Sequence, residues 1–303
     1  MTVRERRRAA SLGELCGLLG YTRQAYYKHQ QLEEQEAIEA ELVVQEVVRH
    51  RTVQKRMGGR KLHYVMGGFF HEHAIVMGRD AFFDLLRSQS LLVPKRRKYK
   101  PRTTVSCPWR RFPNLIKDFV PTRANQVWAS DITYRRIGSG LGYLSLRSEA
   151  DSCRIVGYKL SRDLSADGPV AALAMAFKRQ PDREGLIHHS DRGVQYHCRA
   201  YMRLLGGEIR VSMTRRGDPL ENAIAERVNG ILKDELLEGP FESFSEASRR
   251  LDEAVNVYNH LRPHYSIDML TPAEAHTRSG ELKRRWKNYF SAGTNGPIAQ
   301  AMA

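Results

Sequence analysis

Apolar and polar positions along residues 127–213 follow patterns that predict strands and helices in a definite order. Runs of β-branched and aromatic residues predict five strands, because such side chains suit a pleated, partly buried sheet. These strands cover residues 127–136, 143–149, 154–160, 186–189 and 208–213. Apolar residues at helical spacing predict helices at 165–178 and 197–205. The order predicts an α/β fold with a mixed five-stranded sheet flanked by helices.

A further helix follows the fifth strand and completes the order β-β-β-α-β-α-β-α, which is that of the RNase H-like architecture. Asp218 is a good N-cap for this helix, Pro219 fits its first position, and Glu221 completes a capping arrangement. We assign residues 121–240 to this core, which is followed by a C-terminal helix and basic tail at 241–303.

Residues 1–50 predict an all-α region of the helix-turn-helix type. A short leucine-rich helix stops at Gly20, and Thr22 can cap a second helix that carries Arg23 and Lys28. In a helix-turn-helix the second helix enters the major groove, so these two cations are candidate DNA contacts. A helical hairpin that never touches DNA shows the same pattern, and this alternative stays open.

The rest of the N-terminal part is helical and then basic. A Glu-rich helix at 33–50 is better suited to packing or a helix–helix contact than to DNA. Residues 51–93 predict a second helical DNA-binding region. The linker at 94–120 is too polar to bury itself, and serves as a tether or as an arm along phosphates. Its candidate DNA contacts are Lys95, Arg96, Arg97, Lys98 and Arg102.

The charge of the chain points to a polyanionic partner. Its formal net charge is +15, and residues 1–120 hold 23 Lys and Arg against 12 Asp and Glu, so +11 of the excess lies there. The four cysteines form no Cys-x-x-Cys pair, which argues against a structural zinc site or disulfides and fits a reducing cytoplasm. No apolar run approaches membrane-spanning length. We therefore expect a cytoplasmic, nucleoid-associated protein with no membrane partner.

Three acids stand in settings that suit metal chemistry. Asp131 interrupts a strand-like run although Asp is depleted in strands, Asp191 follows the fourth strand, and Glu226 lies mid-helix. Asp191 alone reads as a turn residue and Glu226 alone as a surface residue, so the three carry weight only as a set. Mg²⁺ takes oxygen ligands and needs few protein carboxylates. Two such ions can clamp the attacking and leaving oxygens of a phosphoryl transfer.

Four polar residues share one face of the predicted Glu226 helix. Asn222, Glu226, Asn229 and Lys233 recur at steps of 4, 3 and 4 residues. A hydrated helix surface looks similar, so this stripe gains force only from the two strand-borne aspartates.

Three motifs in order resemble the DDE signature of bacterial insertion-sequence transposases. They are Trp-x-x-Asp-Ile-Thr-Tyr at 128–134, His-Ser-Asp-Arg-Gly-x-Gln-Tyr at 189–196 and Glu-Asn-Ala-x-x-Glu at 221–226. Within this group the chain resembles the integrase-like protein of the second reading frame, a relative of retroviral integrase. Tyr-Asn-x-x-Arg-Pro-His at 258–264 matches the segment that follows the core in that family. The one departure is Glu221, where the family usually has Asp.

The resemblance implies that Asp131, Asp191 and Glu226 are the catalytic metal ligands for two Mg²⁺ ions, with Mn²⁺ as a substitute. It implies that Lys233 contacts DNA. Further candidate DNA contacts near the core are Asn222, Asn229, Arg192, Arg215 and Arg216. The implied partners are double-stranded transposon-end DNA, target DNA, a homodimer or larger assembly, and the first-reading-frame protein or a frameshift fusion to it.

These expectations together predict a DNA transposase that cleaves transposon-end DNA and joins the 3′-OH to another phosphodiester. Two alternatives remain open at the level of the sequence. A non-catalytic DNA-binding regulator would bind and never nick, and a hydrolytic metal-dependent nuclease would cut without joining.

Overall fold

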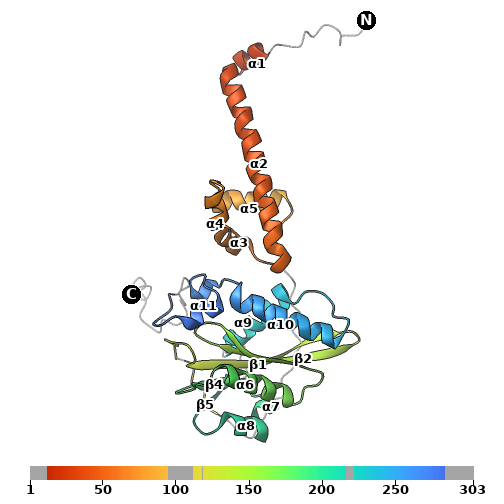
Figure 1. Ribbon diagram of the computed structural model, residues 1–303, viewed down its shortest axis with the longest axis vertical. Helices are drawn as coiled ribbons and strands as arrows, with labels where there is room; N and C mark the ends of the chain where they lie inside the picture. The colour runs from red at the N-terminus through yellow and green to blue at the C-terminus, as the bar shows by residue number, and fades with distance from the viewer. Residues whose placement is uncertain (1–11, 95–111, 118, 216–221, 284–303) are drawn as a thin grey trace, which may run out of the picture. The chain divides into compact units, whose positions relative to one another are not determined.

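The computed structural model describes residues 12–94, 112–117, 119–215 and 222–283 (Figure 1). The chain divides into two compact units. The N-terminal unit comprises Met1–Val53 and Met57–Val93, and the second unit comprises Gln54–Arg56 and Pro94–Ala303. Each unit is described here by itself.

The N-terminal unit is all helical. Its helices are α1 (Leu12–Leu18), α2 (Arg23–Val53), α3 (Gly59–Val65), α4 (Gly67–Glu72) and α5 (Arg79–Ser88). Their core gathers buried residues from α2, α3 and α5 and from the chain around α4: Val43, Val47, Leu62, Met66, Phe70 and Phe82. The core therefore involves the C-terminal half of α2 and leaves its first half without a buried side chain.

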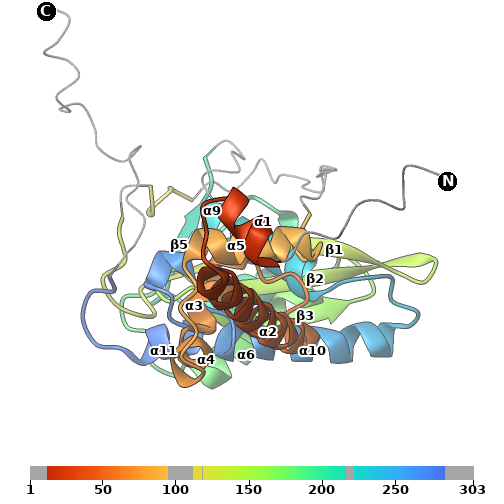
Figure 2. The same cartoon turned by 90° about the horizontal axis from the view of Figure 1, so that it is seen from above.

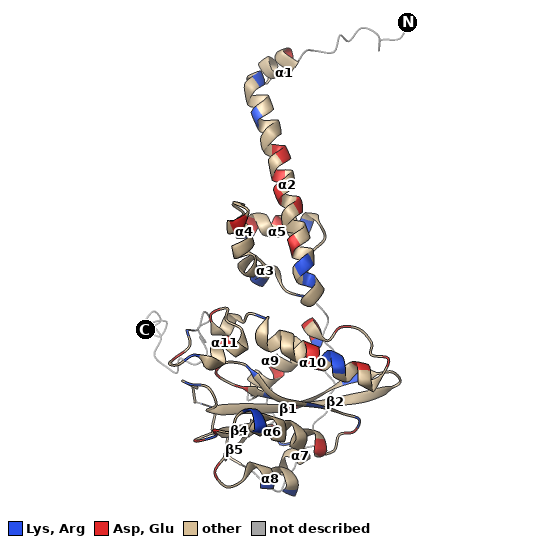
Figure 3. Cartoon of the chain, in the orientation of Figure 1, with Lys and Arg blue, Asp and Glu red and all other residues tan. Residues whose placement is uncertain are grey.

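The sequence predicted two helices where the structure has one. The helix that starts at Arg23 and the Glu-rich helix at 33–50 are both part of α2, because no Gly or Pro interrupts residues 23–53. The predicted cap is confirmed, since Thr22 Oγ1 accepts a hydrogen bond from Ala25 N at 3.1 Å. Lys and Arg lie near the two ends of α2 with Glu between them (Figure 3).

The second unit is built on a five-stranded mixed sheet in the order β3-β2-β1-β4-β5. The strands are β1 (Val127–Ile137), β2 (Gly140–Glu149), β3 (Ile155–Ser161), β4 (Ile187–Ser190) and β5 (Arg210–Met213). The pairs β3·β2 and β2·β1 are antiparallel, whereas β1·β4 and β4·β5 are parallel. This topology confirms the predicted RNase H-like architecture.

Helices cover both faces of this sheet (Figures 1 and 2). Helices α9 (Ala223–Ile231) and α10 (Phe244–His260) pack on one face over Leu144, Leu146 and Ile155. The opposite face carries α6 (Asp167–Arg179), α7 (Val194–His197) and α8 (Arg199–Leu205), packed around Trp128, Val156 and Tyr196. A final helix, α11 (Pro272–Thr277), contributes Ala275 to a small cluster with Ile267 and Leu282.

Element boundaries differ from the predictions at two places near the acids. Helix α9 begins at Ala223 with Asn222 as its N-cap residue, and the capping residues predicted at 218–221 lie outside the described part of the chain. The helix that was predicted to run straight through Lys233 changes at Leu232–Leu236 into a π-helical turn, η3. Such turns are rare and frequently occur at functional sites.

The motif at 258–264 braces the fold. The guanidinium of Arg262 is buried and makes two hydrogen bonds of 2.9 Å to the carboxylate of Glu235 in η3. The hydroxyl of Tyr258 donates to the carbonyl of Cys153 at 3.1 Å. These contacts tie α10 to η3 and to the turn before β3. None of the described helices is long and apolar enough to cross a membrane.

Candidate active site

The register of the sheet places the two aspartates side by side. Strands β1 and β4 are parallel, and Ser130 pairs with Ser190 at the end of β4. Asp131 is the next residue of β1, and Asp191 is the first residue after β4. Both residues therefore lie at the carboxyl end of β4, one position beyond the last pair of the two strands. Ligands of open α/β sheets bind at such strand ends.

Helix α9 is held against β1 by the polar stripe that the sequence indicated. Asn222 Nδ2 donates to the Ser130 carbonyl at 3.0 Å, and Asn229 Nδ2 donates to Asp131 Oδ2 at 2.6 Å. Glu226 lies between these two anchors on the same helical face, four residues after the first and three before the second. The hydrogen bonds therefore direct the face that carries Glu226 toward Asp131.

Lys233, the last residue of the polar stripe, contacts β1 two residues beyond Asp131. Lys233 Nζ in η3 donates to Thr133 Oγ1 at 2.9 Å and lies 4.9 Å from the centroid of the Tyr134 ring. Burial lowers the pKa of Lys233 and the nearby Arg135 lowers it further, while Asp131 acts in the opposite direction. The ammonium group is therefore partly desolvated at the rim of the site.

The electrostatics of the site converge on one carboxyl group. Burial, together with the charges of Asp191 and Glu226, raises the pKa of Asp131 to about 7. The hydrogen bond from Asn229 works against it. Like charges that raise the pKa of a carboxyl group must lie close to it. Asp131 thus interacts with both other acids, although the three come from a strand, a strand end and a helix.

Asp191 is fixed by the loop that follows it. Its Oδ1 accepts a hydrogen bond from Gly193 N at 3.0 Å. A Cβ atom at Gly193 would lie 3.0 Å from this oxygen, so the glycine permits the close approach of the loop to the carboxylate. The next side chain, Arg192, donates from Nε to the Thr214 carbonyl at 2.7 Å and ties this loop to the end of β5.

Comparison with known proteins decides the family. Two models described as integrase core domain match residues 121–219 and 207–272. The "Insertion element IS600 uncharacterized 31 kDa protein" of Shigella sonnei is 31% identical over 266 residues, which cover 86% of this chain and 96% of that protein. The chain therefore belongs to the integrase-core family of bacterial insertion-sequence transposases.

Further relatives point the same way. The "Transposase for insertion sequence element IS904" of Lactococcus lactis subsp. lactis is 28% identical over 249 residues, covering 74% of this chain and 97% of that one. An "Uncharacterized transposase-like protein" of Haemophilus influenzae is 31% identical over 167 residues, covering 54% of this chain and 77% of that one. The resemblance inferred from the motifs is confirmed, and DNA binding and DNA recombination follow from membership of this family.

The site of this transposase-family chain fits a divalent metal ion by its donor chemistry. Across the described ranges, no three His, Cys, Asp or Glu side chains are already gathered as closely as metal ligands would be. Three mutually repelling carboxylates are nevertheless the donor type that Mg²⁺ prefers. The Oδ1 atoms of Asn222 and Asn229 are buried beside them without a hydrogen bond to any described residue. Acceptors of this kind suit the water molecules that Mg²⁺ retains.

The candidate DNA contacts are more scattered. Arg23 and Lys28 are exposed on the first turns of α2, and Arg215 is exposed after β5. Arg192 is partly buried and already engaged through its Nε atom. The remaining candidates lie outside the described residues: Lys95, Arg96, Arg97, Lys98, Arg102 and Arg216.

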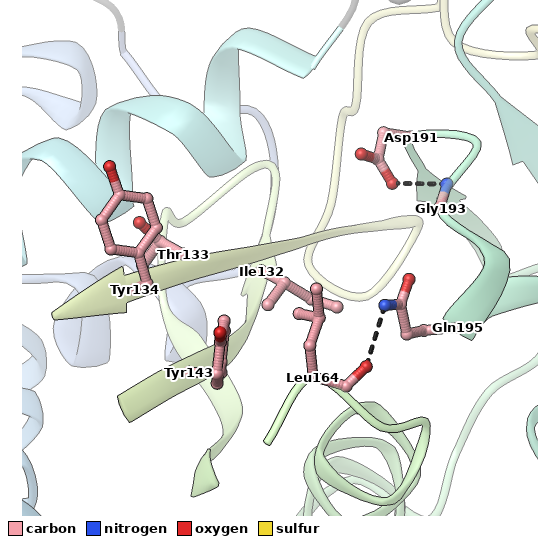
Figure 4. A pocket seen from close by; sticks show the side chains of 8 residues that line it. All are labelled: Ile132, Thr133, Tyr134, Tyr143, Leu164, Asp191, Gly193 and Gln195. Carbon is pink, nitrogen blue, oxygen red and sulfur yellow. Dashed lines mark hydrogen bonds between the residues drawn. The ribbon is translucent and has the colours of Figure 1, made fainter. Parts of the chain in front are cut away.

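The structure also contains a hollow that sequence reasoning did not identify (Figure 4). It lies next to Asp191 and is lined by Ile132, Thr133, Tyr134, Tyr143, Leu164, Asp191, Gly193 and Gln195. The lining comes from β1 and β2, from the loop before α6, and from the loop after β4 together with the start of α7. No motif joins these segments in the sequence, so only the fold could reveal the hollow. Thr133 and the Ser130 carbonyl, which hold the Lys233 and Asn222 side chains, were missed for the same reason.

Proposed function

We propose that this protein is a DNA transposase that cuts one strand at a transposon end and joins the freed 3′-OH to another phosphodiester. The observation that carries the proposal is that Asp131 and Asp191 each directly follow the last paired residues of β1 and β4, and that α9, which carries Glu226, is hydrogen-bonded to β1 beside them. Family membership supplies the DNA substrate. Water is the attacking group in the first step and the 3′-OH in the second.

Each residue of the site has a role under this proposal. Asp131, Asp191 and Glu226 would hold two Mg²⁺ ions, for which Mn²⁺ would substitute, and the positive charge supplied there would favour ionisation of the attacking oxygen and stabilise the leaving one. Asn229 holds Asp131 by a 2.6 Å hydrogen bond, so the orientation of that carboxylate is set before DNA arrives. Lys233 is positioned at the rim to contact a phosphate of the bound strand.

The remaining parts bind and assemble DNA. Arg23 and Lys28 at the start of α2 are proposed to contact transposon-end DNA, together with the basic residues of the linker at 94–120. Joining two ends requires that both be held at once, so we propose a homodimer or larger assembly on DNA. A first-reading-frame protein, or a fusion to it, is proposed as a further partner.

The proposal is tested with Glu226→Gln, which removes the charge and keeps the shape of the side chain. End-bearing duplexes and pre-cut duplexes with a free 3′-OH are incubated with Mg²⁺ or Mn²⁺, and nicked and joined products are quantified. We expect cleavage and joining to fall by more than about 100-fold, because a metal ligand is lost, while DNA affinity stays within a factor of two to three.

Glu253→Gln is the matched control, since Glu253 is an exposed acid on α10 that pairs with Arg249 in the same helix. It should cut and join as the unmodified protein does. Three outcomes contradict the proposal. A wild-type protein that binds and never nicks is a regulator, one that nicks and never joins is a nuclease, and full activity in Glu226→Gln removes Glu226 from the site.

A further inference from the structure

The hollow beside Asp191 arises because β4 is much shorter than β1. Strand β4 pairs with β1 only as far as Ser130, whereas β1 runs on to Ile137. Beyond Ser130, the described strands leave this edge of β1 unpaired up to Ile137, which forms an isolated bridge with Phe241. The side chains that would meet a longer β4 therefore line an open space. This space begins at the same residue, Asp191, that belongs to the carboxylate site.

The walls of the hollow are mostly apolar and aromatic. Ile132 and Leu164 lie at its centre and Tyr143 lies at the end away from Asp191 (Figure 4). The polar groups near Asp191 are already arranged, because Gln195 Nε2 donates to the Leu164 carbonyl at 3.0 Å and Asp191 accepts from Gly193. Apolar and aromatic walls with a few fixed polar groups at one end are typical of a ligand-binding site.

The depth of the hollow restricts what can occupy it. About 350 Å³ of empty space lies against its walls, but this volume includes open solvent, so the hollow is shallow and open and is not an enclosed pocket. A free small molecule needs most of its surface buried, which an open hollow does not offer. A planar group that stays attached to a bound strand has no such need, because the rest of the strand supplies the affinity.

We propose that this hollow is a base-binding pocket, which holds one unstacked nucleobase of the DNA strand next to the phosphodiester positioned at Asp131 and Asp191. The proposal rests on the proposed function, since DNA at the carboxylates is what brings a base to the mouth of the pocket. Stacking on the Tyr143 ring holds the base, in the sequence-tolerant way in which proteins bind unpaired strands. Lys233, close to Tyr134 at the rim, contacts the adjoining phosphate.

The test is a double-mutant cycle on DNA affinity, which combines removal of the Tyr143 ring with removal of one base. Full-length protein is titrated in EDTA, so that no strand is cut, with duplexes that carry the end sequence of the chain's own insertion sequence. A single abasic site is moved through the terminal positions of either strand. On the intact duplex, Tyr143→Ala should weaken binding roughly 5- to 100-fold, because one stacked base is lost. On the duplex that lacks the docked base, Tyr143→Ala should change nothing.

Two control variants complete the cycle. Tyr143→Phe keeps the ring and should bind within about twofold of wild type. Tyr265→Ala removes another partly exposed tyrosine of the same unit, outside the pocket, and should show no coupling to any abasic position. Circular dichroism of each variant establishes that it is folded.

The proposal is overturned if Tyr143→Ala binds the intact duplex as tightly as wild type does. It is also overturned if the loss is equal at every abasic position, which would place a sugar or phosphate against Tyr143 instead of a base. Because the cycle measures binding without divalent ions, it can fail while Glu226-dependent cleavage holds, and it can succeed when cleavage is lost.

Discussion

Two acids on neighbouring strands of the same sheet occupy opposite environments. Glu149, at the end of β2, is fully buried and accepts hydrogen bonds from Asp151 N at 3.0 Å and Ser152 N at 2.7 Å. Burial raises the pKa of Glu149, but these bonds and the one from His276 outweigh it and leave the pKa below its ordinary value. Asp131 receives one side-chain hydrogen bond and faces two like charges, and its pKa rises to about 7. The negative charge of Glu149 is therefore stabilised by hydrogen bonds within the fold. The negative charge of Asp131 is destabilised in the free protein and would be stabilised by a bound cation.

A chain of hydrogen bonds that begins at Trp128 orients the residues around Glu149. The Trp128 indole N–H can only donate, and it donates to Asn125 Oδ1 at 3.1 Å. Asn125 Nδ2 then donates to Gln180 Oε1 at 3.2 Å, and Gln180 Nε2 to His276 Nε2 at 3.1 Å. His276 Nε2 is thereby an acceptor, so the proton lies on Nδ1, which donates to Ser152 Oγ at 3.1 Å. The Ser152 hydroxyl in turn donates to Glu149 Oε2. A chain of this kind has one consistent direction, and it ends on the carboxylate.

The largest effect on stability is therefore expected from Glu149→Gln. The amide keeps the shape of the side chain but loses the charge that accepts the bonds from Asp151 and Ser152, which should lower the free energy of unfolding by about 3 kcal/mol. Urea denaturation at pH 7 measures this, with exposed Glu253→Gln expected within about 0.5 kcal/mol of wild type. The wild-type contribution should begin to fall as the pH drops through the ordinary Glu pKa of about 4.3, and it should be lost once the pH lies below the lowered pKa of Glu149 in the folded chain. An unchanged stability at pH 7 would remove the contrast with Asp131.

Asp131→Asn should act in the opposite direction. A carboxyl group with a pKa near 7 in the folded chain and about 3.9 when unfolded loses stability as the pH rises between these values. The full shift of about three units corresponds to roughly 4 kcal/mol, and partial exposure of Asp131 reduces this to about 2 kcal/mol. In EDTA, the variant should be more stable than wild type by that amount at pH 8 and equal to it at pH 4. A variant that is less stable than wild type at pH 8 would show that the ionised carboxylate of Asp131 is already stabilised in the folded chain.

The contrast between Asp131 and Glu149 also shows which residues could be predicted from the sequence. Helical spacing alone grouped Asn222, Glu226, Asn229 and Lys233, because a helix fixes which residues share a face. An aspartate inside a strand-like run marked Asp131 in the same way. Glu149 carried no comparable signal, since its partners at 151, 152 and 276 become neighbours only through a turn and a distant helix.

Pairing between strands and loops was the part that could not be predicted. The register that sets Asp131 beside Asp191 depends on where β4 ends, and a strand of four residues gives no such information by itself. The hollow lined by Leu164 and Gln195 depends on the same short strand and on two loops. The continuity of α2 could have been predicted, because the stretch lacks helix-breaking residues.

The smallest expected effect is a change in the pKa of Asp131, which tests why this pKa differs from that of Glu149. Asn229→Leu removes the one side-chain hydrogen bond that lowers the pKa of Asp131, so that pKa should rise further, by about one unit. Metal binding must displace the proton, so the pH midpoint of Mn²⁺ binding, followed by calorimetry between pH 6 and 9, should shift upward by the same amount. Asn256→Leu on α10 is the matched control, an exposed amide whose removal should leave the midpoint unchanged. A midpoint that stays in place in Asn229→Leu would mean that this hydrogen bond orients Asp131 without tuning its charge, and that burial and the neighbouring carboxylates alone set it apart from Glu149.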